Sequence, residues 1–451
     1  MEKLKRMIAL ALALVMTLSM AVIASAAKAE AADEFPEENY REEKPANQDA
    51  WIVLMPDRPD DILAEIDWDP DVTYWHYDEN GNKVAWEKIR ILTIGNSFNY
   101  QNDVVDRTYT NNAGGIPHII AGMAEDFGLY VESYMVSTGG GYLNDSVQEG
   151  SAMRREITAV LERFNGDFDF VVMNDKSESP VNTPEIFFQG VAAMTSLLRE
   201  YTDAEIYLQP AWPSPGKLTD CRGKEGAGVE PVYTLEELGK QICDAYYKAA
   251  ADNGLNVSPA GDAVLYAYLT GSDAKLWAAN MGANYNPHQG VAGAYIVACV
   301  HMETLFGVDA RELTYEYDPE FVPDDENGDR LAPERYAELR AVAHAIATDK
   351  VDVHSMEPKN GYLAITMNFT DETGAVTTAA RVVVNGAIET AVSYELAEGS
   401  TLGDVAVKLL DGTDVAADDY TVEYADGAVT LTLVNGAFDQ PMVADIAVKA
   451  E

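Results

Sequence analysis

Short apolar runs alternate with helix-like segments through the middle of the chain. The apolar runs fall at residues 91–94, 129–136, 168–173 and 205–209 and near residues 255–259. The segments between them carry apolar residues at helical spacing. Strands that alternate with helices are typical of a parallel sheet covered by helices, so the pattern predicts an α/β domain over residues 88–350.

Capping residues mark the ends of some helix-like segments. In "NTPEIFFQGVAAMTSLLREY", Thr183 is a candidate cap and Pro184 a candidate first helical residue. Proline is favoured there because the first N–H of a helix has no partner inside the helix. A last helix-like segment, "PERYAELRAVAHAIATDK", closes the domain near Lys350. The other predicted helices cover residues 117–127, 152–164, 234–252 and 291–305.

The pattern changes after about residue 354, where Val, Thr and Ala dominate and the helical period disappears. In "RVVVNGAIE" and "YTVEYADGAVTLTL", Asn-Gly or Asp-Gly stands between alternating runs, which is the commonest sequence signal of a hairpin. This predicts a C-terminal β-sandwich, an Ig-like accessory domain over residues 355–451. It serves in attachment to carbohydrate or to a cell surface, or it is only a spacer.

The first residues have the pattern of a secretory signal peptide. A basic start is followed by an apolar segment and by small residues at Ala24, Ser25 and Ala26. We therefore expect residues 1–26 to be a signal peptide and the protein to be secreted. Residues 27–87 are acidic and rich in proline and tryptophan, which predicts an N-terminal extension. No later stretch is apolar enough to predict a membrane span.

Charge and cysteine content limit the expected binding partners, disulfides and metal sites. The chain has 75 acidic and 31 basic residues, a formal net charge of −44. Such a surface repels nucleic acid and anionic lipid, so neutral or cationic partners are expected. The cysteines are Cys221, Cys243 and Cys299. They are odd in number and lack metal-type spacing, so the sequence predicts no disulfide framework, at most one bridge, and no metal site.

Residues that can carry chemistry follow directly after the predicted strands. Ser97 follows the first strand in "GNSF", Gly140 the second in "STGGGYL", and Asn174 the third in "MNDKSESP". His288 comes later, just before a helix. Loops at the carboxyl ends of parallel strands converge on one crevice. Acyl transfer needs a nucleophile, a base and oxyanion donors, and these four residues supply them, although Ser97 alone reads as a turn serine.

The blocks "ILTIGNSF", the double glycine with a following leucine, "DFVVMNDKS" and "HQGVAGAYIVACVHMETLFG" resemble the SGNH hydrolase superfamily of GDSL-like esterases. They are most similar to a bacterial branch with a GNSF block, and the resemblance covers residues 88–307. It implies a three-layer α/β/α, flavodoxin-like domain with Ser97 as nucleophile and His288 as general base. It also implies oxyanion donors from the Ser97 amide, the Gly140 amide and the Asn174 side chain, with no cofactor and no metal.

One position departs from that family pattern. The family usually has an aspartate three residues before the histidine, and here the position is Tyr285. Its neighbours Asn284 and Asn286 can hold an imidazole by a hydrogen bond, but an amide cannot stabilise an imidazolium as a carboxylate does. A carbonyl or a carboxylate from another loop is the alternative. Which group orients His288 is left open by the sequence.

Two further residues are candidates for substrate binding. Trp212, in "LQPAWPSPG", either walls a sugar-binding crevice or packs in the core, and Ser177 matches a serine of the third block that supports its loop. The sequence as a whole predicts a secreted serine esterase that hydrolyses small acyl esters, acetyl esters above all, on polysaccharide. The alternatives are a weak or inactive carbohydrate-binding or surface protein with the same fold, and a lipase-like enzyme that prefers long acyl chains.

Overall fold

The structure is a computed structural model of the 451-residue chain. It describes residues 40–41, 51–54, 73–77, 83–85, 88–100, 115–228, 230–270, 276–277, 288–317, 331–355, 362–384, 390–396, 400–409, 412–425, 427–434 and 442–450. The predicted signal peptide at residues 1–26 and most of the predicted extension lie outside the described residues. Contacts divide the chain into two compact units, residues 1–46 with 66–88, and residues 47–65 with 89–451.

A six-stranded sheet forms the centre of the second unit. In sheet order its strands are β2 (Trp51–Leu54), β6 (Tyr130–Ser137), β5 (Lys88–Gly95), β7 (Phe170–Met173), β8 (Glu205–Leu208) and β9 (Asn256–Val257). The strand pairs β2–β6, β5–β7, β7–β8 and β8–β9 are parallel. The α/β domain with a parallel sheet predicted from the alternating pattern is therefore present.

The sheet also takes in a strand that the sequence analysis did not assign. β2 joins the sheet edge beside β6 from within the segment predicted as an extension. Its four residues, WIVL, are a short apolar run with acidic and proline-rich sequence nearby. A run of four residues is too short for an alternating period to appear, so only its pairing with β6 reveals it.

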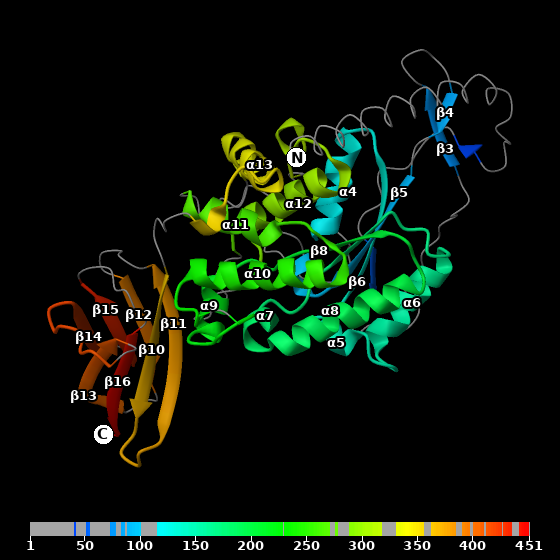
Figure 1. Ribbon diagram of the computed structural model, residues 1–451. Coiled ribbons are helices and arrows are strands. Elements are labelled where there is room, and N and C mark those ends of the chain that lie inside the picture. The colour runs from blue at the N-terminus through cyan, green and yellow to red at the C-terminus, as the bar shows by residue number, and fades with distance from the viewer. Residues whose placement is uncertain are drawn as a thin grey trace, which may run out of the picture. The chain divides into compact units, whose positions relative to one another are not determined.

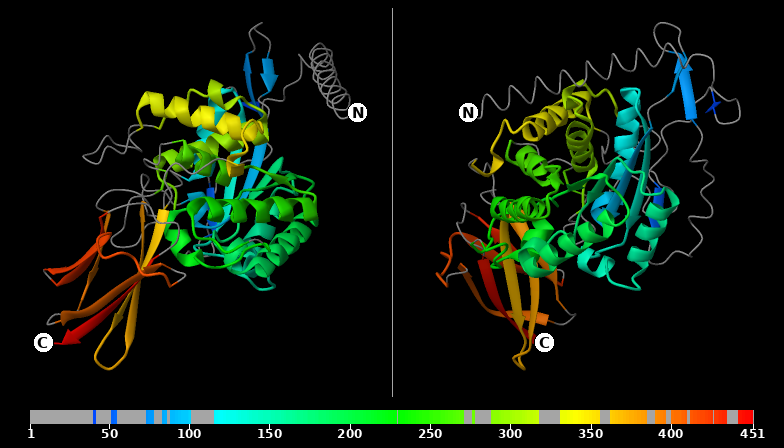
Figure 2. Two further views of the ribbon diagram at one scale, coloured as in Figure 1. Left: turned by 60° about the vertical axis from the view of Figure 1, so that its left-hand side comes forward. Right: turned by 45° about the vertical axis from the view of Figure 1, so that its right-hand side comes forward.

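Helices lie on both faces of this sheet (Figures 1 and 2). One group contains α4 and α12, against which α11 and α13 pack, and the other contains α5, α6, α8 and α10. The helices and 3₁₀ turns of this region are α3 (Ser97–Tyr100), α4 (Ile116–Asp126), α5 (Leu143–Ser146), α6 (Ala152–Arg163), α7 (Ser179–Asn182), α8 (Pro184–Arg199), α9 (Pro215–Cys221), α10 (Leu235–Asn253), α11 (Ala260–Leu269), α12 (Val291–Phe306), η1 (Ala310–Glu312), α13 (Pro333–Ala347) and η2 (Val353–Ser355).

The core lies between the sheet and these helices. Every residue of β6 is buried, as are the last six of β5, which is why the central strands read as continuous apolar runs. A charged pair is enclosed with them: Arg90 Nε lies 2.7 Å from Glu132 Oε2, and each side chain is 6% exposed. Arg90 Nη1 also lies 2.8 Å from Asp167 Oδ2, so two carboxylates compensate the buried guanidinium.

Seven strands after residue 361 form two further sheets. One sheet has the order β11-β10-β16-β13 and the other β12-β15-β14. Their strands are β10 (Tyr362–Thr370), β11 (Val376–Val384), β12 (Thr390–Glu395), β13 (Ser400–Leu409), β14 (Tyr420–Ala425), β15 (Ala428–Leu433) and β16 (Met442–Ala450). Buried side chains from both sheets, among them Met367, Phe369 and Leu431, belong to one apolar cluster.

The two predicted hairpins of this region have different outcomes. Around Gly427, β14 and β15 pair antiparallel with Tyr424 opposite Val429, as the Asp-Gly signal predicted. Around Asn385, β11 and β12 belong to different sheets, so the hairpin expected there is wrong. An Asn-Gly pair predicts that the chain turns. It does not predict which sheet the next strand joins, because that depends on long-range packing.

The first unit contains a small sheet with the order β1-β3-β4, built from β1 (Tyr40–Arg41), β3 (Thr73–Tyr77) and β4 (Lys83–Ala85). β1 pairs with β3 in parallel and β4 pairs with β3 in antiparallel orientation. Across the described part of the whole chain, none of the helices combines the length and the apolar character needed to cross a bilayer.

Candidate active site

Ser97 stands where the central strand β5 gives way to the short helix α3. The side chain of Asn96 shapes this turn, since its Oδ1 accepts a hydrogen bond from the Phe98 N–H at 3.1 Å. Its backbone carbonyl accepts a second from the Asn99 N–H at 3.0 Å. An asparagine at this position satisfies N–H groups that the helix itself cannot. The turn is therefore fixed, and Ser97 is held at the carboxyl end of a buried strand.

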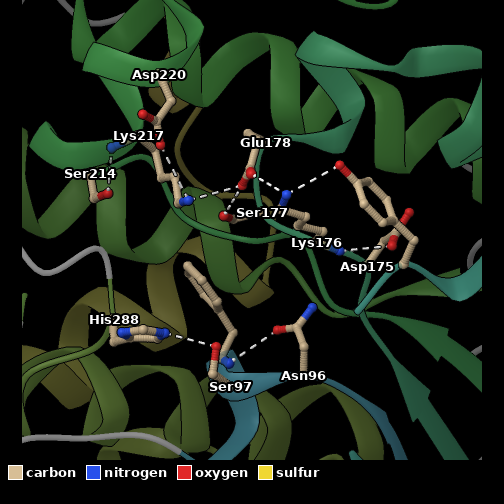
Figure 3. A network of polar contacts seen from close by, with 12 residues as sticks. Asn96, Ser97, Asp175, Lys176, Ser177, Glu178, Ser214, Lys217, Asp220 and His288 are labelled. Carbon is tan, nitrogen blue, oxygen red and sulfur yellow. Dashed lines mark hydrogen bonds and ion pairs between the residues drawn. The ribbon is translucent and has the colours of Figure 1, made fainter. Parts of the chain in front are cut away.

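His288 lies against Ser97 although 191 residues separate them in sequence. Its Nε2 is 2.7 Å from Ser97 Oγ, which is hydrogen-bond distance (Figure 3). His288 precedes α12, whose N-terminal end brings the imidazole to this edge of the sheet. The ring of Phe98 packs 5.4 Å from the imidazole and 4.7 Å from the ring of Trp212. The structure thus brings together the nucleophile and the base that the sequence predicts.

The surroundings of His288 keep its imidazole neutral. Burial, followed by the positive charge of Lys217, lowers the pKa of His288 to about 4. A neutral imidazole with Nε2 directed at a hydroxyl can accept the hydroxyl proton as a general base. The electrostatics of the site therefore fit a base that is active at neutral and mildly acidic pH.

The low pKa of His288 has a measurable consequence for any reaction that uses it as a base. Activity needs the neutral form, so kcat/KM for a neutral ester should stay constant from pH 7 down to about 5 and fall through a pKa of about 4. Replacing Lys217 by methionine removes a charge that opposes protonation, so the acid limb should move to higher pH. A pH–rate profile of both proteins measures this.

The matched control for that experiment is Lys248→Met. Lys248 is another ion-paired lysine: its Nζ lies 2.6 Å from Asp252 Oδ2, and its side chain is exposed on α10. Its removal should leave the acid limb in place. A Lys217→Met profile that coincides with the parent profile would contradict the electrostatic role given to Lys217.

The side chain of Asn174 lies beside the nucleophile turn. Its Nδ2 donates to Asn96 Oδ1 at 3.1 Å and, more weakly, to the Asp175 carbonyl at 3.4 Å, and its Oδ1 accepts from Asn99 Nδ2 at 2.8 Å. The residue is 1% exposed. Donation to a substrate oxyanion therefore requires that Nδ2 give up the longer contact, which is the weaker of the two.

Gly140 lies on the loop after β6, with its backbone in the left-handed region at φ +63° and open space where a Cβ would stand. Asn96 reaches this loop as well, since its Nδ2 donates to the Gly141 carbonyl at 3.5 Å. Asn96 thus contacts the loops of all three predicted oxyanion donors. The sequence analysis missed this residue, and the capping ability of an asparagine just before the serine was the available signal.

Removing the side chain of Asn174 should slow the chemical step far more than it weakens substrate binding. If its amide stabilises the oxyanion, Asn174→Ala should lower kcat by about 10² to 10³, with KM little changed. Steady-state kinetics on an acetate ester test this, with Asn253→Ala as control, since the Asn253 side chain donates to the Ala249 carbonyl at the end of α10 within the described contacts. A kcat within a few-fold of the parent would remove Asn174 from the oxyanion site.

A chain of buried polar side chains supports the nucleophile turn from behind. Gln209 Nε2 donates to Asn99 Oδ1 at 3.2 Å, and Gln209 Oε1 lies 2.8 Å from His301 Nε2. Burial lowers the pKa of His301 to about 3, so its ring is neutral and donates to Gln209. Sequence analysis left Gln209 out, because a glutamine after a strand carries no signal of its own.

Two lysines share one carboxylate above the catalytic pair (Figure 3). Glu178 lies 2.9 Å from Lys176 Nζ and 3.0 Å from Lys217 Nζ. Burial raises the pKa of Glu178, but the lysines outweigh it and bring the pKa to about 2. Lys217 belongs to α9, where the side chain of Ser214 accepts a hydrogen bond from the Lys217 N–H. This ion-pair network links the loops after β7 and β8.

The remaining predicted site residues fall into two groups. Ser177 is 2% exposed and donates to Glu178 Oε2 at 2.8 Å. Trp212 is fully buried against Phe98, as expected if it packs in the core. The three residues predicted to orient the imidazole lie outside the described residues: Asn284, Tyr285 and Asn286. The three cysteines are free and buried.

Two clusters of metal-ligating side chains occur among the described residues, and neither contains Ser97 or His288. One consists of Cys243, Asp262 and His354, and the other of Glu303, Asp309 and His344. The chemistry of the Ser97–His288 pair requires no metal or cofactor, because serine and imidazole supply nucleophile and base between them.

Comparison with known proteins gives similarity to solved structures only. No family model matches the chain, and no curated protein matches it. A candidate SGNH hydrolase from Slackia heliotrinireducens is 23% identical, covers 49% of this chain and 100% of its own, and has a TM-score of 0.35. An inhibitor-bound aryl esterase of M. smegmatis is 12% identical. The match covers 49% of this chain and 99% of the esterase, and the TM-score is 0.33.

A carbohydrate acetylesterase family member from Sinorhizobium meliloti is 11% identical, with 49% of this chain and 100% of its own covered and a TM-score of 0.31. All three TM-scores lie below 0.5. The chemistry of the site therefore rests on the contacts of Ser97, His288 and their neighbours.

Proposed function

We propose that the protein is a serine esterase of the SGNH type that hydrolyses small acyl esters. The observation that carries the proposal is the 2.7 Å contact between Ser97 Oγ and His288 Nε2 at the carboxyl end of the central strand. A second support is the lowered pKa of His288, which leaves the imidazole neutral at pH 7, with one ring nitrogen able to accept a proton. A turn serine with a structural role needs neither feature.

The proposed reaction runs through a covalent acyl-enzyme. Ser97 Oγ attacks the ester carbonyl carbon while His288 Nε2 takes the hydroxyl proton. His288 then returns this proton to the oxygen of the leaving alcohol as the C–O bond breaks. Water attacks the acyl-enzyme, gives a proton to His288, and the carboxylic acid departs as Ser97 Oγ is reprotonated by His288.

Negative charge on the substrate oxygen develops in both steps of this reaction. The amides of Ser97 and Gly140 and the side chain of Asn174 are the donors proposed for it. Donors aimed at such charge are each worth about 3 kcal/mol. The Asn174 amide gives up its contact with the Asp175 carbonyl when it donates to the oxyanion. Asn96 acts on all three at once, because it bonds to the helix turn after Ser97, to the loop after Gly140 and to Asn174.

The proposed substrate is an acetylated polysaccharide outside the cell. Support comes from the signal-peptide pattern at residues 1–26 and from the net charge of −44, which disfavours anionic partners such as nucleic acid. A secreted esterase of this kind meets neutral polymers. The C-terminal sheets are proposed as an Ig-like β-sandwich that attaches the enzyme to carbohydrate.

The experiment is a comparison of acyl donors. Chromogenic esters with acetyl, butyryl and decanoyl groups, and acetylated xylan as polymer, are incubated with the parent and with Ser97→Ala. We expect turnover to fall as the acyl chain lengthens and acetate to be released from the polymer by the parent alone. Preference for the decanoyl ester would indicate a lipase, and no turnover of any ester would indicate a binding protein.

A further inference from the structure

Three side chains with metal-binding atoms meet on the side of the helices rather than at the strand ends. Cys243 comes from α10, Asp262 from the first turn of α11 and His354 from η2. The Cys243 Sγ, a carboxylate oxygen of Asp262 and a ring nitrogen of His354 all lie within 4.8 Å of one another. His354 Nε2 is 2.7 Å from Asp262 Oδ1, and the Cys243 thiol hydrogen-bonds the same carboxylate.

The cluster borders a cavity of about 280 Å³. Besides Asp262 and His354, the cavity is lined by Tyr247, Asp349 and Asp352. Tyr247 donates its hydroxyl to the second oxygen of Asp262 at 2.8 Å. Three carboxylates face one space that is large enough for an ion and its water.

No lysine or arginine among the described residues forms an ion pair with Asp262, although this residue is only 5% exposed. The other charged side chains named in the cavity lining, Asp349 and Asp352, are acidic as well. A carboxylate is rarely buried without a partner that carries full positive charge. A bound cation would therefore compensate the negative charge of Asp262.

The second cluster, Glu303, Asp309 and His344, differs because lysine and arginine side chains contact it. There His344 Nδ1 lies 2.8 Å from Glu303 Oε1, but Lys350 contacts the other ring nitrogen of His344, and Arg311 pairs with Asp309. Arg311 thus already compensates the Asp309 carboxylate, and a second protein cation lies against the imidazole. Of the two clusters in the described residues, only that of Cys243, Asp262 and His354 has its ligands directed at one another without such a competitor.

We propose that Cys243, Asp262 and His354 bind a Zn²⁺ ion, with a water molecule from the adjoining cavity as the fourth ligand. Thiolate sulfur, imidazole nitrogen and carboxylate oxygen together suit zinc, whereas Mg²⁺ and Ca²⁺ prefer oxygen alone. Zinc bonds of about 2.0 to 2.3 Å place ligand atoms roughly 3.5 Å apart, so side-chain movements of about an ångström close the site.

Binding is a proton exchange at the thiol. Zn²⁺ enters from the cavity, the S–H bond of Cys243 breaks, the proton leaves to solvent and the sulfur keeps its electron pair to form the bond to zinc. Nothing is oxidised or reduced. Because binding releases a proton, zinc affinity should fall as pH falls.

Such an ion ties three segments that are distant in sequence. It joins α10 and α11 to η2, the turn that ends the α/β domain before the C-terminal strands begin. Its effect should therefore be on the stability of the domain boundary, and it is independent of the ester chemistry at Ser97. The proposal can be correct whether or not the proposed function is.

The test is zinc stoichiometry of the untagged chain. The protein is dialysed against zinc sulfate, freed of excess ion by gel filtration, and measured by elemental mass spectrometry. We expect one zinc ion per chain in the parent, close to none in Cys243→Ser and His354→Gln, and an undiminished content in the controls Glu303→Gln and Cys221→Ser. Cobalt loading should give a thiolate charge-transfer band that Cys243→Ser lacks and Cys221→Ser keeps.

His354→Gln keeps the proposal testable if Cys243→Ser does not fold, since His354 is partly exposed at the surface. A parent without bound zinc would overturn the proposal. So would zinc retained equally by folded His354→Gln, or zinc lost equally from Glu303→Gln. A zinc-dependent rise in the melting temperature of the parent, absent in His354→Gln, is the expected companion result.

Discussion

Replacing Ser97 by alanine should lower kcat for a chromogenic acetate ester by about five to six orders of magnitude, the loss typical of a serine hydrolase without its nucleophile. The substitution removes only a hydroxyl group, so the fold should persist. Stopped assays on purified parent and variant measure the ratio directly. The circular dichroism of the two proteins should coincide.

Thr195→Val is the matched control. It removes another buried hydroxyl, 8% exposed like that of Ser97, which donates to the Val191 carbonyl within α8. Its kcat should stay within a few-fold of the parent. Equal losses in the two variants would mean that the site responds to any change in the region and that Ser97 has no special part.

The second large effect is expected at Gly95, the last residue of β5. A Cβ on Gly95 would stand 1.8 Å from Asn174 Oδ1 and 2.7 Å from Asn99 Nδ2. Neither amide can retreat without breaking the network that holds the nucleophile turn. Gly95→Ala should therefore cost about 1–3 kcal/mol of unfolding free energy and, by displacing Asn174, most of the activity.

Urea unfolding of a double-mutant cycle separates this clash from a general loss of stability. In an Asn174→Ala background the nearest atom is gone, so Gly95→Ala should destabilise the protein less than it does in the parent. The two substitutions should thus show coupling. Strict additivity would mean that the contact between Gly95 and Asn174 does not limit the residue at position 95.

Much of this architecture follows from the sequence because the signals are local. The central strands are buried on both faces and appear as apolar runs, and the loops after them carry Ser97 and Asn174 at a place where sheet topology brings them together. His288 was predicted from the resemblance of the block that begins with it to a known family, since a histidine before a helix has no catalytic signal of its own. The edge strand β2 could not, because four apolar residues fit a strand or a buried loop equally well.

The features that sequence reasoning missed depend on long-range contacts. Asn96 and Gln209 belong to the site because of their partners, and a single side-chain amide has no periodic or spacing signal. The same holds for the cluster proposed to bind zinc. The cysteines show no metal-type spacing, and the side chains at positions 243, 262 and 354 come together only through the packing of α10, α11 and η2.

The most direct test of the account is the site of covalent labelling by a fluorophosphonate probe. The probe forms a stable phosphonyl ester only with a serine that a neighbouring base activates. Intact-mass measurement and peptide mapping of the parent should show a single adduct, on Ser97, that is absent from Ser97→Ala and strongly slowed in His288→Gln. An unlabelled parent, or an adduct on a serine other than Ser97, would contradict the catalytic pairing of Ser97 with His288.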